Sequence, residues 1–445
     1  MNLEKYQQYS RIARGLEQAD LVLKDARIIN VFTEEIIRGD IAIQDGIIAG
    51  IGSFQGKEER DLGGKYVCPG FIDSHLHLES TLVTPAELVT VASRHGTTTF
   101  IVDPHESANV SGLAGIDYIL EQTEDVKANV YVMMPSCVPA TGIDDNGCTL
   151  TAQDMAPYLN NSRILGLDSI SVVQGDKGMH DKLELFEGRI RDGHAPFLVE
   201  GDLQAYAMAG IATDHECSFF DYAMRERRNG LTILIREGSA ARNLEALVGG
   251  LVQRKMNGEG FCFCTDDKHI EDIQQEGHID HNVRKAIRLG MNPVSAIKMA
   301  TINAANCYGL KDKGAIAPGR QADLLVLSDL VNVEVEDVYY KGQLIDKNEN
   351  IVIKPCAPEL KNTVHVAEFS KEAFHLESKD GTFPVILCEE GQITTRKGTL
   401  KASDGPCEFQ PDDDYQKIAV VERHKATGKI GRGVIGGFGI RGGAI

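Results

Sequence analysis

The 445-residue sequence lacks the features that mark a membrane-spanning or secreted protein. No apolar run approaches the roughly 18 residues needed to cross a bilayer, and the opening stretch MNLEKYQQYSRIARGLEQAD has no apolar core typical of a secretory signal. The 10 cysteines form no dense, regular framework, so we expect them to be free thiols. These absences predict no membrane partner and a cytoplasmic location.

Positive charge is also scarce. The chain has 46 Lys and Arg against 65 Asp and Glu, a formal net charge of −19. Binding to a phosphate backbone needs clustered basic side chains, so this balance argues against a nucleic-acid partner and favours a small ligand that is neutral or cationic. Hydrophobic residues make up 42% of the chain and charged residues 25%, which is typical of a folded globular protein.

Two segments far apart in the sequence have the residue pattern of short strands. Residues 1–68 contain LVLKDARIIN and DIAIQDGIIAGIG, with Asp45-Gly46 as a hairpin turn. Residues 310–360 contain ADLLVLSDL and VEVEDVYYKGQLI. We predict that these two flanks pair as one composite β-sandwich domain.

The segment 69–309 between the flanks alternates apolar strands with helical stretches, which favours a parallel sheet. Eight such units close a (β/α)8 TIM-like barrel, in which the chemistry lies at the carboxyl ends of the strands. The expected strands end at PGFID, TTTFIVD, VYVMMP, ILGLD, Gly193-His194, GIATDH, LTILIREG and GFCFCTD.

The residue pattern changes again in residues 364–445, which predicts a separate, partial C-terminal α+β module. The strand FCFC places Cys262 and Cys264 on one face, and we interpret them as packing residues.

Histidines follow several of the predicted strands. His75 and His77 leave one strand on the same face, where two imidazoles can chelate one divalent ion. The alternative is a pair of hydrogen-bonded strand residues. Three further strand ends carry His194, His215 and Asp266, which favours a metal site at the barrel rim. We assign Asp266 a second role, moving a proton between water and the leaving group.

Other polar side chains stand near the same rim, with less support from the pattern. Glu216 directly follows His215, and we assign it a catalytic role, with a structural role as an equal alternative. A second group is predicted to bind substrate or to support the ligands, with helix capping or solvation as the alternative: Asp103, His105, Glu106, Ser239, Arg242 and His269.

Several segments resemble the signature segments of bacterial adenine deaminases, in the same order along the chain. They are PGFIDSHLHLESTLVTP, GTTTFIVDPHE, MMPSCVPAT, GHAP, DHEC, IREGSAARNLEAL and CTDDKHIEDIQQEGHIDH. The resemblance implies an amidohydrolase with a binuclear centre of Mn(II) or Fe(II), with Zn(II) as an alternative. It also implies that a metal-activated hydroxide converts adenine to hypoxanthine and ammonia in purine salvage. Because such barrels are commonly homo-oligomers, we also expect a homo-oligomer.

The sequence departs from this family in two places. The family's fourth strand ends in a bridging Glu, within Leu-Gly-Leu-Gly-Glu, whereas this chain reads Leu-Gly-Leu-Asp168-Ser169. We assign Asp168 as the sixth metal ligand, although a shift of one residue turns a strand side chain to the other face. Family members also continue beyond the final GGFGIRGGAI, so we expect a shortened C-terminal domain. The alternatives are therefore a weakened or silent adenine deaminase paralogue, or another hydrolase of cyclic amides or amidines.

Overall fold

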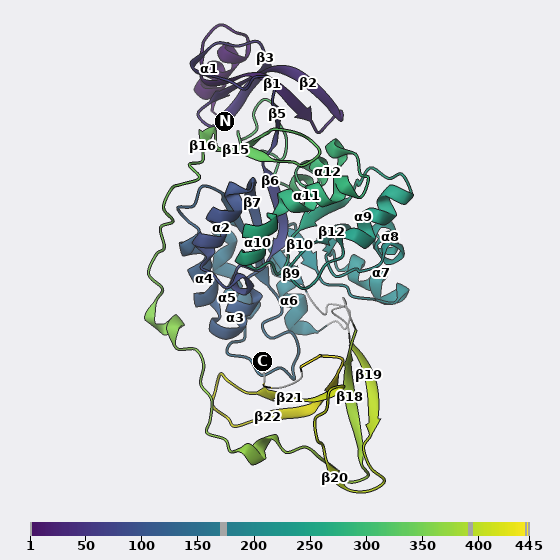
Figure 1. The fold of residues 1–445 in the computed structure, drawn as a ribbon. Coiled ribbons are helices and arrows are strands. Elements are labelled where there is room, and N and C mark those ends of the chain that lie inside the picture. Colours follow the sequence, from purple (N-terminus) through teal and green to yellow (C-terminus); the bar gives the residue numbers. More distant parts are fainter. Residues whose placement is uncertain (1, 170–175, 390–394, 441–442, 444–445) are drawn as a thin grey trace.

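The computed structural model describes residues 2–169, 176–389, 395–440 and 443. Figure 1 shows three units along one axis, namely an N-terminal β-unit at the top, a barrel in the middle and a C-terminal β-unit at the bottom. A long irregular segment after β16 (Gln343–Leu344) passes along the outside of the barrel and joins the first unit to the last. Strands from the two flanks thus meet at one end of the barrel, and the segment after β16 leaves that end.

The N-terminal β-unit is built from both flanks. Its helix is α1 (Leu3–Ala13), and its strands are β1 (Ala19–Asn30), β2 (Glu35–Gln44), β3 (Ile47–Gly52), β4 (Gly56–Asp61), β5 (Tyr66–Pro69), β14 (Leu324–Leu327), β15 (Val335–Tyr340) and β16. The two flanks join where β5 pairs antiparallel with β14, with Cys68 opposite Leu325. Hydrogen bonds link all eight strands into a single sheet, in which β4 branches from β1. The predicted pairing of the flanks is confirmed, but the strands form one continuous sheet and not the two separate sheets of a sandwich.

The middle unit is the predicted eight-stranded parallel barrel. Its strands are β6 (Phe71–Leu76), β7 (Thr97–Val102), β8 (Asn129–Pro135), β9 (Ile164–Ser169), β10 (Ile190–Gly193), β11 (Thr213–Asp214), β12 (Thr232–Arg236) and β13 (Phe261–Cys264). Strands β6 to β10 form one hydrogen-bonded sheet, and strands β11 to β13 form another. A parallel bridge between Leu76 and Asp266 joins the last strand to the first, and the Ala212 N–H donates to Arg191 O at 2.8 Å between β10 and β11.

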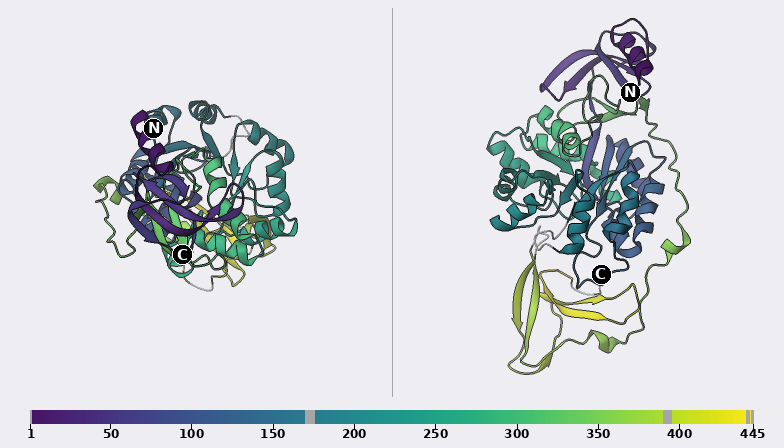
Figure 2. Two further views of the ribbon diagram at one scale, coloured as in Figure 1. Left: turned by 90° about the horizontal axis from the view of Figure 1, so that it is seen from above. Right: turned by 180° about the vertical axis from the view of Figure 1, so that it is seen from behind.

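Helices cover the outside of the barrel (Figure 2). They are α2 (Pro85–Arg94), α3 (His105–Ser111), α4 (Leu113–Gln122), α5 (Ala152–Met155), α6 (Lys177–Leu185), α7 (Glu200–Met208), α8 (Phe220–Arg228), α9 (Leu244–Gln253), α10 (Ile270–Glu276), α11 (Ile279–Arg288), α12 (Pro293–Met299) and α13 (Ile302–Cys307). Local sequence explains where some of them begin. In α2, Thr84 and Glu87 form a reciprocal capping box, and Pro85 occupies the first turn, where its missing N–H has no cost.

The interior of the barrel is packed with apolar side chains below the carboxyl ends of the strands. Ile72, Ile101 and Leu234 form a buried cluster there with Cys262 and Cys264. Both cysteines are fully buried free thiols, and burial raises the pKa of each well above its ordinary value. The prediction that they serve in packing is confirmed.

The C-terminal unit lies beyond the carboxyl ends of the barrel strands (Figure 2). Its strands are β17 (Glu377–Ser378), β18 (Thr382–Cys388), β19 (Thr395–Lys401), β20 (Cys407–Glu408), β21 (Tyr415–Val421) and β22 (Ile430–Gly436). Lys429 Nζ lies 2.8 Å from Asp145 Oδ2, which joins the hairpin of β21 and β22 to the loop after β8. Within the described part of 364–445 there is a short 3-10 turn but no α-helix, so the α+β prediction was wrong in its helical part.

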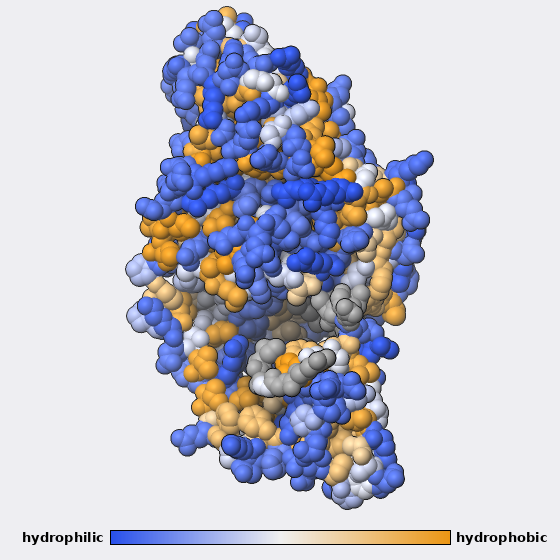
Figure 3. Space-filling model, in the orientation of Figure 1, coloured by the Kyte–Doolittle hydropathy of each residue, from blue (hydrophilic) through white to orange (hydrophobic). Residues whose placement is uncertain are grey.

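The surface in Figure 3 is mostly hydrophilic with scattered apolar patches, as is usual for a folded globular protein. No helix in the described ranges combines the length and the apolar character that crossing a bilayer requires.

Candidate metal centre

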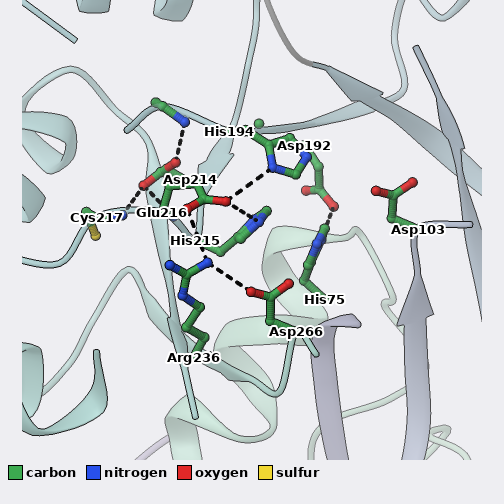
Figure 4. A network of polar contacts seen from close by, with 12 residues as sticks. His75, Asp103, Asp192, His194, Asp214, His215, Glu216, Cys217, Arg236 and Asp266 are labelled. Atoms are coloured by element: carbon green, nitrogen blue, oxygen red, sulfur yellow. Dashed lines mark hydrogen bonds and ion pairs between the residues drawn. The ribbon is translucent and has the colours of Figure 1, made fainter. Parts of the chain in front are cut away.

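The carboxyl ends of five barrel strands bring the predicted ligands into one buried cluster. Parallel strands of a barrel all end at the same rim, so residues nearly 200 positions apart can become neighbours. The cluster is formed by His75 from β6, His77 directly after β6, Asp168 from β9, His194 after β10, His215 after β11 and Asp266 after β13. Several of these side chains are visible in Figure 4.

His75 and His77 point into the same space, as the two-residue period of a strand predicts. Their Nε2 atoms lie 3.2 Å apart, and both side chains are almost fully buried. The ring of His75 stacks on that of His215 at 3.9 Å between centroids. His77 Nδ1 lies 2.9 Å from the backbone oxygen of Asp103, a contact that orients its Nε2 toward the cluster.

Asp168 is directed into the cluster despite the altered sequence of the fourth strand. It is fully buried, and its Oδ2 lies 2.9 Å from His194 Nε2. It stands opposite Asp192 in the register of β9 and β10. The shorter carboxylate at this position therefore reaches the histidines.

Asp266 follows β13 with a φ of 57°, a left-handed conformation that Asp tolerates better than most residues. Its backbone N–H donates to His75 O at 3.0 Å, and its carbonyl accepts from the His77 N–H at 3.2 Å. Its Oδ1 lies 3.1 Å from His77 Nε2. The chain thus holds Asp266 against both His75 and His77.

Opposite charges compensate one another inside the cluster. Burial alone would lower the pKa of His77 and His194, but the carboxylates of Asp266 and Asp168 outweigh it and raise both pKa values above the ordinary value. Burial alone would raise the pKa of Asp168 and Asp266, and the neighbouring imidazoles lower both. For His75, burial and the nearby charges of other histidines lower the pKa.

The donor set fits a divalent metal. Four imidazoles and two carboxylates provide the nitrogen and oxygen ligands that Zn, Mn and Fe accept. Triplets of their ligand atoms, such as those of His75, His215 and Asp266, lie within 4.8 Å of one another. Among the described residues, His75 Nδ1, His215 Nδ1 and Asp168 Oδ1 are buried with no hydrogen-bond partner. An orphaned buried polar atom costs about 1–3 kcal/mol, and coordination to a cation would remove that cost.

The predicted rim residues after β7 border the cluster. Asp103 is fully buried, and its Oδ2 lies 2.7 Å from His105 Nδ1. This contact raises the pKa of His105 to about 9, even though burial acts in the opposite direction. Glu106 Oε2 lies 3.6 Å from His77 Nδ1. These side chains support His77 from the side away from Asp266.

The predicted residues after β12 and β13 make contacts with one another. The Ser239 hydroxyl donates to Asp272 and accepts the backbone N–H of His269 at 2.8 Å. Arg242 Nη2 donates to Ser239 O at 3.4 Å. The described hydrogen bonds and ion pairs do not join Ser239, Arg242 or His269 to the metal ligands, so their substrate contact stays a prediction.

Two buried residues of the site were missed in the sequence. Arg236 ends β12 and contacts both Glu216 and Asp266. Asp192 is fully buried on β10, with its Oδ2 4.0 Å from His75 Nδ1, and burial raises its pKa to about 8. The signals were present, because Arg236 ends an apolar strand as Asp266 does, and Asp192 precedes His194 by one strand period.

An eight-stranded barrel with histidines and carboxylates gathered at the carboxyl ends of its strands defines a metal-dependent hydrolase of the amidohydrolase class. Comparison with known families agrees, since residues 66–345 match the amidohydrolase family and residues 392–445 match the adenine deaminase C-terminal domain. Among solved structures, an adenine deaminase superposes with a TM-score of 0.57 at 18% identity, covering 74% of this chain and 100% of that one. A dihydroorotase superposes with a TM-score of 0.54 at 18% identity, covering 73% and 98%. At such identities these structures support the fold alone.

Curated relatives identify the family. The adenine deaminase of Desulfitobacterium hafniense is 52% identical over 451 residues, covering 100% of this chain and 79% of the relative. That of Clostridium acetobutylicum is 42% identical over 445 residues, covering 97% and 78%. The chain belongs to the adenine deaminase family.

Proposed function

We propose that this chain hydrolyses adenine to hypoxanthine and ammonia. One observation carries the proposal: in a chain 52% identical to a curated adenine deaminase, the barrel gathers four histidines with Asp168 and Asp266 in one buried cluster. A neutral purine also suits a protein whose formal net charge is −19, because no anionic group has to approach it.

The residues that would hold metal are His75, His77, Asp168, His194, His215 and Asp266. A divalent ion bound there supplies Lewis acidity and lowers the pKa of water toward neutrality. We propose two ions, Mn(II) or Fe(II), with Zn(II) as the alternative, because imidazole and carboxylate donors accept all three.

Asp266 is the residue that we propose moves the proton. Its carboxylate accepts a proton from the attacking water and returns it to the exocyclic amine, which leaves as ammonia. The neighbouring imidazoles lower the pKa of Asp266 despite burial, so its carboxylate is ionised. Its Oδ1 lies 3.1 Å from His77 Nε2, and its Oδ2 lies 2.9 Å from Arg236 Nη1.

The test follows adenine conversion to hypoxanthine by absorbance, after loading with Mn(II) or Fe(II) under low oxygen. General acid–base groups contribute about 10²–10⁴ in rate, so Asp266→Asn should lower kcat by that factor. Asp337→Asn is the control, since Asp337 pairs with Arg60 in the N-terminal β-unit, far from the cluster. Full activity in Asp266→Asn would contradict the assigned role. A metal-loaded wild type that releases no ammonia from adenine would overturn the function, and cyclic amides would be the next substrates to screen.

A further inference from the structure

Arg236 is a buried arginine at the centre of the site that the mechanism above does not explain. Its side chain is 3% exposed, and its guanidinium lies between two carboxylates (Figure 4). Its Nη1 lies 2.9 Å from Asp266 Oδ2 and 3.2 Å from Glu216 Oε2. The Arg236 guanidinium therefore bridges Asp266, which we propose moves the proton, and Glu216, which follows His215.

Arg236 contacts one of the two oxygens of each carboxylate. Asp266 gives Oδ2 to the guanidinium and keeps Oδ1 at 3.1 Å from His77 Nε2. Glu216 Oε2 makes an ion-pair contact with the guanidinium at 3.2 Å without hydrogen-bond geometry, and its Oε1 lies 3.4 Å from His215 Nε2. In both residues the oxygen that Arg236 leaves free is the one that faces the imidazoles.

The backbone around Arg236 is fixed by a neighbouring buried amide. The Arg236 N–H donates to Asn243 Oδ1 at 2.8 Å, and Asn243 Nδ2 donates to Cys217 O at 2.8 Å and His215 O at 3.3 Å. The same side chain thus ties Arg236 to the loop that carries His215 and Glu216. These bonds fix the backbone from which the Arg236 side chain extends toward the two carboxylates.

Electrostatics explain why a cation is needed at this point. Two carboxylates buried near one another repel, and each must be compensated or lose its charge. Both contacts come from Nη1, and the planar guanidinium presents this nitrogen in a fixed direction, which the flexible ammonium of lysine does not reproduce. A mobile carboxylate would rotate either oxygen toward the reacting centre, and a misplacement of about 1 Å can lower a rate by about 10²-fold.

We propose that Arg236 is a positioning residue that reserves one oxygen each of Asp266 and Glu216, and so determines which oxygen of Asp266 exchanges the proton. This inference rests on the proposed function for its kinetic readout. The competing role is purely structural, an ion pair that only stabilises the packing of β12 against β13.

The experiment compares Arg236→Ala and Arg236→Lys with the wild type in the metal-loaded protein. We expect Arg236→Ala to lower kcat by about 10²-fold with a much smaller change in KM, while metal content stays at the wild-type level. Millimolar guanidinium should restore part of the lost kcat in Arg236→Ala, and ammonium should not. The control is Arg191→Ala, since the Arg191 guanidinium, among the described residues, donates only to the backbone oxygens of Ala209 and Leu183 on the outside of the barrel.

A second measurement does not depend on turnover. In a thermal shift assay, millimolar guanidinium should stabilise Arg236→Ala but not the wild type or the double variant Arg236→Ala with Asp266→Asn. Stabilisation without adenine turnover in the wild type would retain the positioning role and reject the substrate. Activity of Arg236→Ala within about threefold of the wild type, or a loss that guanidinium does not reverse in either assay, would overturn the proposal.

Discussion

At the scale of single residues, Asp168 stands where the family pattern has a glutamate on the fourth strand, and the structure still places it among the metal ligands. Its carboxylate is one carbon shorter than the glutamate expected on the fourth strand, yet its Oδ2 lies 2.9 Å from His194 Nε2. Its Oδ1 has no hydrogen-bond partner among the described residues, which leaves a lone pair for a metal. We therefore expect Asp168→Ala to weaken metal binding by at least about 10-fold and to lower kcat in parallel.

Metal content by elemental analysis and Mn(II) titration measure this effect. Asp117→Ala on α4 serves as the control, because Asp117 bonds to Tyr158 on the surface. Unchanged metal affinity in Asp168→Ala would show that Asp168 is not a ligand and that the other five residues hold the metal without it.

At the scale of elements, the loop after β11 lies beside Glu226, a buried carboxyl group of α8. Asp214 Oδ2 accepts the backbone N–H groups of Glu216 and Cys217, which shapes the turn that presents His215. Glu226 of α8 is fully buried beside it, and burial together with the charge of Asp214 raises the pKa of Glu226 to about 11. Tyr222 and Cys217 also face this carboxyl group. Glu226 is therefore protonated in the folded protein at neutral pH.

The pH dependence of stability follows from this shift. Below the unfolded pKa, Glu226 is protonated in both states, and its contribution to the free energy of unfolding is fully present. Above it, only the unfolded state loses the proton, so that contribution is lost as pH rises toward the folded pKa. Glu226→Gln removes the ionisation, so it should raise Tm relative to wild type at about pH 8 and by less at about pH 5. Thermal unfolding at the two pH values measures the difference, and an equal effect at both would contradict the raised pKa.

At the scale of the whole molecule, one of the buried apolar clusters contains residues of both flanks and of the barrel. Leu325 of β14 is fully buried in the cluster that contains Phe71 of the first barrel strand, and it packs beside Gly96 before β7. Truncating a buried leucine leaves a cavity, so Leu325→Ala should lower the free energy of unfolding by about 2–5 kcal/mol. Leu344→Ala on β16, where the side chain is 44% exposed, should stay within about 0.5 kcal/mol. Denaturant unfolding followed by circular dichroism tests both, and equal effects would show that the flanks do not stabilise the barrel.

Much of this organisation was predictable because it depends on local patterns. Most barrel strands lie in short apolar runs that are followed by polar residues, and His75, His194, His215 and Asp266 lie at or just after strand ends. The helical part of the C-terminal unit was predicted wrongly, because its alternating apolar residues specify strands such as β18 and β21. Alternation identified the flanking strands, but it did not reveal that they join into one sheet.

The sequence by itself determined the barrel, the pairing of the flanks and the strand ends that carry the ligands, because side-chain periodicity and turn residues act over a few positions. Only the tertiary structure decided that Asp168 faces His194, that Asp192 lies behind His75 and that Arg236 bridges Glu216 and Asp266. The physical reason is the closure of the barrel. The curvature of the sheet, and not the spacing along the chain, sets which strand ends face one another across the rim and therefore which buried charges compensate each other.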